Sequence, residues 1–532
     1  GKVAASTFAA KALLEGPLKK AEKPGDGSSS FLLNFKQSYL DQTSKALYSY
    51  VDSTGLPFKF TDIYGKVSLN AANGSKVNFF GFNFTDGVKY QGIADIDWRN
   101  WGAGTNFVLV PSGSAVLIEG VFALSNYTIE ELEGSLPPRT SSINNFNAGL
   151  NFKYFMGNNE VKYGINVTGV KTGLSYFNSY GYKLSEDRVS TELAGYLNYK
   201  MRFGKWVIDP GMRLQYYATL AVLSPEPRSG FKFNVSDRLR IKGAAGIYSQ
   251  NLIATNNDRD VVNLFYGFLT APDDIPKTLT TANGTVRNIT DPLQRANHLV
   301  GGFEYDLTPK TTVNIEGYYK DFRQVTNLNR DKLYNDTPEF ANQPDELKKD
   351  FIVETGSAYG VDMLVKYENK GLYLWAVYSL DYVNRFDGVQ EYNPIWDRRN
   401  NVNLVASYTF GRHESWMASA RWNYGSGFPF TQNQGFYEQI PFGNGVNTNI
   451  NNVNGDLANI FGPLNGGRLT DYSRLDLGLT KTWKLDEYQV VKVDMSITNV
   501  YDRDNIFYVN RTTGQEIYQL PLLPSLGVSY TF

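Results

Sequence analysis

The residues of this chain that could bind a metal or transfer a proton are those with carboxylate or imidazole side chains. The triplets Asp-Ile-Asp at 95–97 and Asp-Arg-Asp at 258–260 each place two carboxylates two positions apart. Because Ca²⁺ takes roughly six to eight oxygen ligands and neither triplet has EF-hand spacing, solvated carboxylates are the favoured interpretation. Only His298 and His413 could supply imidazole, and cysteine is absent. The sequence therefore predicts no metal site, no bound cofactor and no enzyme.

A charged triplet, Asp397-Arg398-Arg399, directly precedes a predicted strand. A guanidinium fork binds a carboxylate well, so the structural interpretation is an ion-paired strand entrance. The functional alternative is a charged contact with lipopolysaccharide or with a lumen. Basic and acidic residues balance overall, with 52 against 53 and a net charge of −1. This balance gives no electrostatic support for a nucleic-acid partner.

The segment 428–470 is the best candidate for ligand contact, because it combines many Asn and Gly residues with a group of aromatic side chains. Aromatic rings on a polar loop suit a sugar or peptide ligand, suit a partner subunit equally, and could also simply pack the loop against itself. The six aromatic residues are Phe428, Phe430, Phe436, Tyr437, Phe442 and Phe461.

The elements that must position these groups are strands, because apolar and polar residues alternate with a period of two. The segments 193–203 and 206–216 flank a tight turn at Gly204-Lys205, and each carries charges on one face only. We assign Leu214 to a lipid-facing surface and Arg213 to a wet lumen. The segments run to about 10–14 residues, longer than the 5–6 typical of soluble proteins and suited to crossing a bilayer at a tilt.

The same hairpin pattern recurs along the chain and gives about 21 recognisable strands. Short turns alternate with long connections, of which 250–295, 323–355, 384–400 and 428–470 are examples. Outer-membrane barrels have short periplasmic turns and longer extracellular loops. The predicted fold is therefore all-β, a transmembrane antiparallel barrel of about 22 strands that occupies residues 1–532.

The last seven residues form an alternating strand that ends on an aromatic side chain. One face carries Leu526, Val528, Tyr530 and Phe532, and the other carries Gly527, Ser529 and Thr531. This ending resembles the closing strand of bacterial outer-membrane barrels, whose terminal aromatic residue is part of an assembly signal. The aromatic content of 14% suits the girdles of such barrels.

Several segments resemble, in the expected order, TonB-dependent outer-membrane receptors of the SusC-like and related branches. The matching segments are 224–228, 235–243, 298–305, 315–320, 359–362, 396–400, 423–429, 471–477 and 497–501. Together they cover nearly the whole chain. Members of this family close 22 strands around an N-terminal plug domain, so residues 1–18 are expected to form the first barrel strand region after a plug. The count of about 21 fits 22 strands if the first strand lies largely before residue 1 or survives only as residues 1–6.

The resemblance implies energised uptake of a large or scarce ligand across the outer membrane, with the TonB complex acting through the plug. Either the plug precedes residue 1 in the full protein or the barrel lacks one, and the resemblance favours the first. Expected partners are outer-membrane lipid and lipopolysaccharide, with a surface lipoprotein or other outer-membrane subunits as further candidates.

Three other functions are compatible with the sequence. A barrel of the same ancestry could be a structural subunit of a secretion or protein-insertion complex. A barrel without a plug would be a passive pore. A secreted β-rich carbohydrate binder is the third, and the charged inner faces and the terminal Phe532 argue against it.

Overall fold

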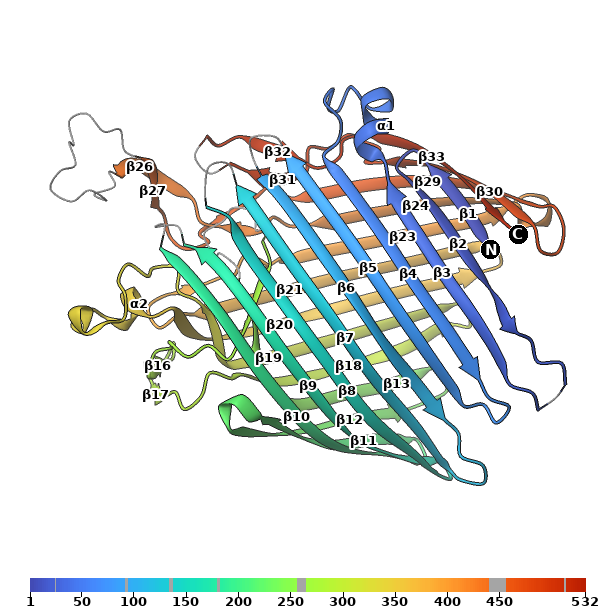
Figure 1. Ribbon diagram of the computed structural model, residues 1–532, viewed down its shortest axis with the longest axis horizontal. Helices are drawn as coiled ribbons and strands as arrows, with labels where there is room; N and C mark the ends of the chain where they lie inside the picture. Colours follow the sequence, from blue (N-terminus) through green and yellow to red (C-terminus); the bar gives the residue numbers. More distant parts are fainter. Residues whose placement is uncertain are drawn as a thin grey trace.

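A single closed wall of antiparallel strands dominates the computed structural model (Figure 1). The structure describes residues 1–23, 25–90, 94–133, 137–178, 182–255, 265–439, 456–510 and 513–532. The main sheet contains 23 strands within these ranges. One of them, β22 (Glu391–Tyr392), pairs only with the end of β21. The remaining 22 strands form the barrel, which confirms the predicted fold class.

The strands follow one another around the wall in sequence order, each antiparallel to the next. They are β1 (Lys2–Ser6), β2 (Ala9–Lys19), β3 (Ser28–Ser38), β4 (Phe58–Asn70), β5 (Lys76–Tyr90), β6 (Ala94–Leu109), β7 (Val116–Glu133), β8 (Arg139–Met156), β9 (Asn159–Phe177), β10 (Lys183–Phe203), β11 (Trp206–Tyr217), β12 (Val222–Asn234), β13 (Leu239–Gln250), β18 (Gln294–Thr308), β19 (Thr311–Leu328), β20 (Phe351–Asn369), β21 (Leu372–Phe386), β23 (Asn400–Phe410), β24 (Trp416–Gly425), β29 (Tyr472–Lys484), β30 (Val490–Thr498) and β33 (Leu523–Thr531).

The wall closes where the first strand meets the last. Val3 lies opposite Tyr530, and Ala5 lies opposite Val528. The short β1 therefore pairs with both β2 and β33, and residues 1–18 hold β1 and most of β2. Closure leaves no unpaired edge in the described wall, and an unpaired edge could not be tolerated in lipid.

Successive side chains of each strand alternate between an exposed apolar outer face and a polar inner face. On β11 Leu214 is 48% exposed on the outside, whereas Arg213 points inward and donates from Nε to Gln215 Oε1 at 2.9 Å. The predicted assignment of these two residues to opposite faces is confirmed. Inner-face charges pair with one another: Arg240 lies 2.7 Å from both Glu304 and Asp306. Such pairs suit a wet lumen.

One end of the barrel has short turns, as at residues 204–205 and 370–371, and the other carries the longer connections. By the outer-membrane rule, the long connections are extracellular. The expectation that every second connection is long is wrong for part of the wall. The β11–β12 connection spans only 218–221, and β7–β10 run to 18, 18, 19 and 21 residues. These strands are longer than is needed to span the lipid. On the extracellular side they therefore continue as strands where other parts of the wall have loops.

Two α-helices of the described chain lie in the long connections, α1 (Leu40–Leu47) between β3 and β4 and α2 (Asp345–Lys348) between β19 and β20. Neither is long and apolar enough to span a membrane, and the same is true of any helix in the described ranges. Tyr48 and Tyr50 follow α1 and donate to the carbonyl oxygens of Pro524 and Leu522 at 2.6 and 2.7 Å. These bonds attach the α1 connection to the start of the last strand.

Deleting Phe532 is expected to lower the amount of folded barrel in the outer membrane several-fold. Leu526, Val528 and Phe532 are about half exposed on the outer face, in line with Tyr530. The Phe532 ring lies 5.6 Å from that of Tyr530, so the predicted pattern of faces is confirmed and the terminal ring is accessible. Heat-modifiable mobility of outer-membrane fractions measures folded protein. Wild-type levels of the deletion variant would refute the proposed role of the terminal residue in assembly.

Candidate functional site

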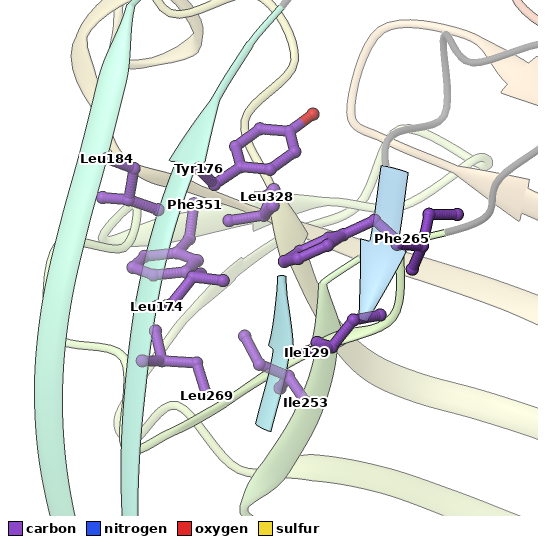
Figure 2. Close-up of a cluster of buried hydrophobic side chains, with 10 residues drawn as sticks. Ile129, Leu174, Tyr176, Leu184, Ile253, Phe265, Leu269, Leu328 and Phe351 are labelled. Atoms are coloured by element: carbon purple, nitrogen blue, oxygen red, sulfur yellow. The ribbon is translucent and has the colours of Figure 1, made fainter. Parts of the chain in front are cut away.

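The extracellular mouth of the barrel is partly filled by its own connections. The β13–β18 connection contains a small hairpin, β14 (Leu252–Thr255) with β15 (Gly267–Thr270). Figure 2 shows its apolar side chains among residues of the inner wall. Ile253, Phe265 and Leu269 are at most 1% exposed and share one cluster with Leu174 and Phe351. Burying each such side chain contributes about 1.5–3 kcal/mol, so the hairpin is held as part of the fold.

Polar bonds attach this same connection to the inner wall. Arg188 of β10 forms a two-pronged ion pair with Asp273 and also lies 2.6 Å from Glu186. The amide of Phe268 donates to Ser141 Oγ at 3.0 Å, and the amide of Thr270 donates to Thr172 Oγ1 at 3.1 Å. The hairpin is therefore fixed over β8–β10 and covers one side of the mouth.

A network of charged residues joins the β13–β18 connection to the β19–β20 connection. Lys349 donates to Asp274 at 2.8 Å and also pairs with Asp336. Lys332, nearly buried, lies 2.5 Å from Asp350. Burial opposes the charge on Lys349, but the bonds to Asp274 and Asp336 outweigh it and raise the pKa of Lys349. The bond from Lys349 lowers the pKa of Asp336.

These pKa directions predict that the two connections stay joined across a wide pH range. The contribution of the Asp336 carboxylate to the stability of this junction is complete above its ordinary pKa of 3.8 and is lost as the pH falls through the lowered pKa. The Lys349 contribution is complete below its ordinary pKa of 10.5 and is lost as the pH rises through the raised value. Burial raises the pKa of Asp350, which narrows the window on the acid side. Hydrogen exchange of residues 329–350 should therefore keep the same protection between about pH 6 and 9, after correction for intrinsic rates. Loss of protection within that window would contradict the assignment.

Beside the covered side of the mouth lies an open pocket with aromatic walls. It has a volume of about 470 Å³ and lies against the inner faces of β4–β7. Phe58 and Phe60 come from β4, Phe84 from β5, Trp98 from β6 and Tyr127 from β7. Trp98 and Tyr127 also pack against the buried cluster, which fixes that wall of the pocket. The pocket is a mainly apolar site on the lumen side of the described structure.

This pocket was not predicted from the sequence. A signal for it is present in Phe79-Phe80-Gly81-Phe82-Asn83-Phe84, where aromatic residues occupy both faces of one strand. Phe79 is exposed on the lipid side, whereas Phe82 and Phe84 stack on the lumen side with ring centroids 4.9 Å apart. A wet lumen alone requires no aromatic side chains, so an aromatic inner face indicates a surface that contacts something.

The aromatic residues of the predicted ligand loop do not form one surface. Phe428 lies beneath the Arg398 guanidinium at 4.1 Å, and burial lowers the pKa of Arg398. Phe430 belongs to β25 (Pro429–Phe430), which pairs with β28 (Gly467–Arg468). These two aromatic residues lie at the base of the loop.

The outer part of the loop is a hairpin of β26 (Asn433–Gln439) and β27 (Asp456–Phe461), at the far end of the molecule from the termini in Figure 1. Phe436 and Tyr437 are both about 44% exposed, and as neighbours in one strand they face opposite sides. Phe461 pairs with Asn433. Phe442 lies outside the described residues. A ligand-contact role for this loop stays a prediction.

The charged triplet Asp397-Arg398-Arg399 forms ion pairs at the entrance to β23. Asp397 is fully buried and lies 3.0 Å from Arg399 Nε and 2.5 Å from Arg468 Nη2. Its other oxygen accepts from the amide of Val383 at 2.8 Å. The ion-paired strand entrance is therefore confirmed, and it gains a partner, Arg468, that sequence spacing could not reveal.

The carboxylate triplets form no metal site among the residues that the structure describes. Asp95 accepts from Lys89 Nζ at 2.8 Å, an ordinary surface ion pair. The triplet at 258–260 lies outside the described residues.

Comparison with known proteins supports the architecture. No known protein family and no curated protein sequence matches the chain. Among solved structures, the whole chain superposes on 79% of the copper transporter OprC, with a TM-score of 0.62 and 12% identity. It superposes on 80% of the FrpB iron transporter (F3-3 variant) from Neisseria meningitidis, with a TM-score of 0.64 and 12% identity. It also superposes on 79% of BauA, the ferric preacinetobactin receptor from Acinetobacter baumannii, with a TM-score of 0.63 and 11% identity.

At these identities the likeness establishes the fold. The neighbours are TonB-dependent outer-membrane receptors, and the likeness extends over the complete closed wall. The chain is an outer-membrane-type β-barrel of 22 strands with the fold of the TonB-dependent receptors.

Proposed function

We propose that this barrel belongs to an energised outer-membrane receptor that takes up an organic ligand with aromatic groups, such as a metal chelate. The observation that carries the proposal is the aromatic pocket of Phe58, Phe60, Phe84, Trp98 and Tyr127 on the inner wall at the loop end of the barrel. A ligand that enters between the loops would reach this pocket at the loop end of the wall. Aromatic rings bind flat organic groups by stacking and by burial of apolar surface.

The lumen supports a gated pathway. A wall of 22 strands encloses a space that side chains alone do not fill, and its inner face carries paired charges such as Arg240 with Glu304. We propose that a plug domain occupies this space and that the TonB complex acts on the plug. About a fifth of each neighbour's chain lies outside the part that superposes on this chain, and that length is sufficient for a domain of this kind.

The neighbours' names support the ligand class. OprC is described as a copper transporter, FrpB as an iron transporter and BauA as a ferric preacinetobactin receptor. A chelate presents its organic shell to the receptor, so the aromatic pocket would contact the chelator. Selectivity would then depend on the shape and charge of the chelator.

Uptake of a radiolabelled iron–catecholate complex by cells that carry the full-length protein tests the proposal. Accumulation should require TonB, and Trp98→Ala should weaken cell-surface binding about tenfold, as expected for the loss of one stacking partner and its buried area. Trp101→Ala is the matched control, since Trp101 lies on the same strand but faces lipid. Equal accumulation in cells without TonB would instead indicate a passive pore.

A further inference from the structure

The lipid-facing surface of β12–β21 contains a groove. Three outward glycines, Gly243, Gly301 and Gly317, lie directly opposite one another on adjacent strands. The groove has a volume of about 720 Å³, and its lining is almost entirely apolar. A Cβ built on Gly301 would meet nothing within 4 Å among the described atoms, so the space above it is open. Outside the groove the outer face carries large side chains, as at Leu214, which is 48% exposed.

A row of tyrosines borders the groove on its extracellular side. Tyr319, Tyr359 and Tyr382 lie opposite one another on β19, β20 and β21, one outward position beyond Gly317. The Tyr359 and Tyr382 rings stack with centroids 5.3 Å apart. Tyrosines at this depth mark the boundary between the acyl chains and the headgroups. The groove therefore lies just inside the outer leaflet.

Directly beyond the tyrosine row, the same outer surface has a polar cleft of about 530 Å³. The outward side chains of Ser357 and Asn384 line one side, and the hairpin of β16 (Thr278–Thr280) with β17 (Val286–Asn288) covers the other. Tyr319 lines both the cleft and the apolar groove. One continuous surface therefore changes from polar to apolar at the membrane boundary.

The cleft carries two arginines, Arg287 and Arg323, and two carboxylates, Asp321 and Glu391, whereas Arg385 of the same lining points to the lumen side and packs over Phe322. Arg323 is paired with Asp321 at 2.6 Å. Arg287 donates to the carbonyl oxygen of Arg323 at 2.6 Å, which fixes its position, and its buried Nε has no hydrogen-bond partner within the described part of the chain. A guanidinium that is fixed in this way by a carbonyl oxygen is suited to a phosphate group.

We infer that the groove and the cleft together bind one molecule of lipopolysaccharide from the outer leaflet. Its phosphate would lie against Arg287, its sugar hydroxyl groups would contact Ser357 and Asn384, and an acyl chain would occupy the groove over Gly301. Hydroxyl and amide side chains beside the guanidinium favour a phosphorylated sugar over a simple phospholipid headgroup. This inference depends on the barrel's place in the membrane and is independent of what the lumen transports.

Binding of bisphosphorylated lipid A to purified, delipidated full-length protein in detergent tests the inference by native mass spectrometry. Gly301→Leu fills the groove, and Arg287→Gln removes the fixed charge. Each is expected to weaken binding about tenfold, because each removes one of the two halves of the site. Gly195→Leu and Arg238→Gln are the matched controls. Gly195 is an outward glycine of β10 with equally open space, and Arg238 lies in a short turn at the opposite end.

The controls should bind lipid A as the wild type does. Heat-modifiable mobility establishes that each variant is folded. Equal binding by wild type and Gly301→Leu, or equal weakening by Gly195→Leu, would overturn the site. If phosphatidylglycerol bound as tightly as lipid A, the glycolipid assignment would be wrong.

Discussion

Replacing Leu214 with arginine is expected to destabilise the folded barrel by about 1–3 kcal/mol, because it places a guanidinium on the lipid-facing side of β11, between the bilayer midplane and the extracellular interface. Leu214 lies on the outer face, and its neighbours across the strands are Gly195 and Pro225, neither of which can bond to the new charge. Equilibrium unfolding in lipid vesicles, followed by tryptophan fluorescence, measures the change in the free energy of unfolding.

The adjacent substitution Arg213→Leu provides the control. Arg213 faces the lumen and bonds Gln215, so its loss leaves no charge in lipid and removes one partly solvated hydrogen bond. We expect a cost of about 0.5–1.5 kcal/mol. Equal sensitivity at positions 213 and 214 would contradict the assignment of faces on which the whole barrel depends.

Asp397→Asn is expected to loosen the base of the long β24–β29 connection by about 2–4 kcal/mol. The change removes the buried negative charge that holds Arg399 and Arg468. Breaking a fully buried pair costs about 3–5 kcal/mol. The two arginines are about one-third exposed, so water offsets part of that cost. Hydrogen exchange of Gly427 and Val383, whose amides lie in this junction, measures the effect.

The same substitution at Asp494 is the control for this effect. Asp494 is an exposed lumen carboxylate that accepts from Thr480 Oγ1 at 2.7 Å. Asp494→Asn should leave the exchange of Gly427 unchanged. If Asp397→Asn also left it unchanged, Asp397 would not anchor the connection.

The barrel could be predicted from the sequence because the face of each strand residue and the pairing of neighbouring strands depend on residues that are close together in the sequence. Alternation with period two assigns every strand residue to a face, and short turns set the pairing of neighbours, as at Gly204-Lys205. This rule alone is enough to place Arg213 in the lumen and both Leu214 and Phe532 on the outer face. No contact between distant parts of the chain has to be known for any of these assignments.

The contacts at the mouth could not be predicted in this way. The aromatic pocket combines residues of four strands, and the Asp397–Arg468 pair joins positions 71 residues apart. Alternation says that Trp98 faces inward, but it does not say which inward residues of neighbouring strands lie beside it. That depends on strand register. The β14–β15 hairpin was hidden for a related reason, since the chain returns into the mouth through contacts with distant strands.

The intact mass of the native protein, purified from outer membranes together with its bound chains, tests the central proposal most directly. A gated receptor predicts a plug domain, seen as a mass above the barrel's 59.8 kDa by roughly a hundred residues or as a tightly bound chain of that size. A mass of 59.8 kDa with no bound chain, together with steady ion conductance in planar bilayers, would identify an open pore and contradict energised uptake.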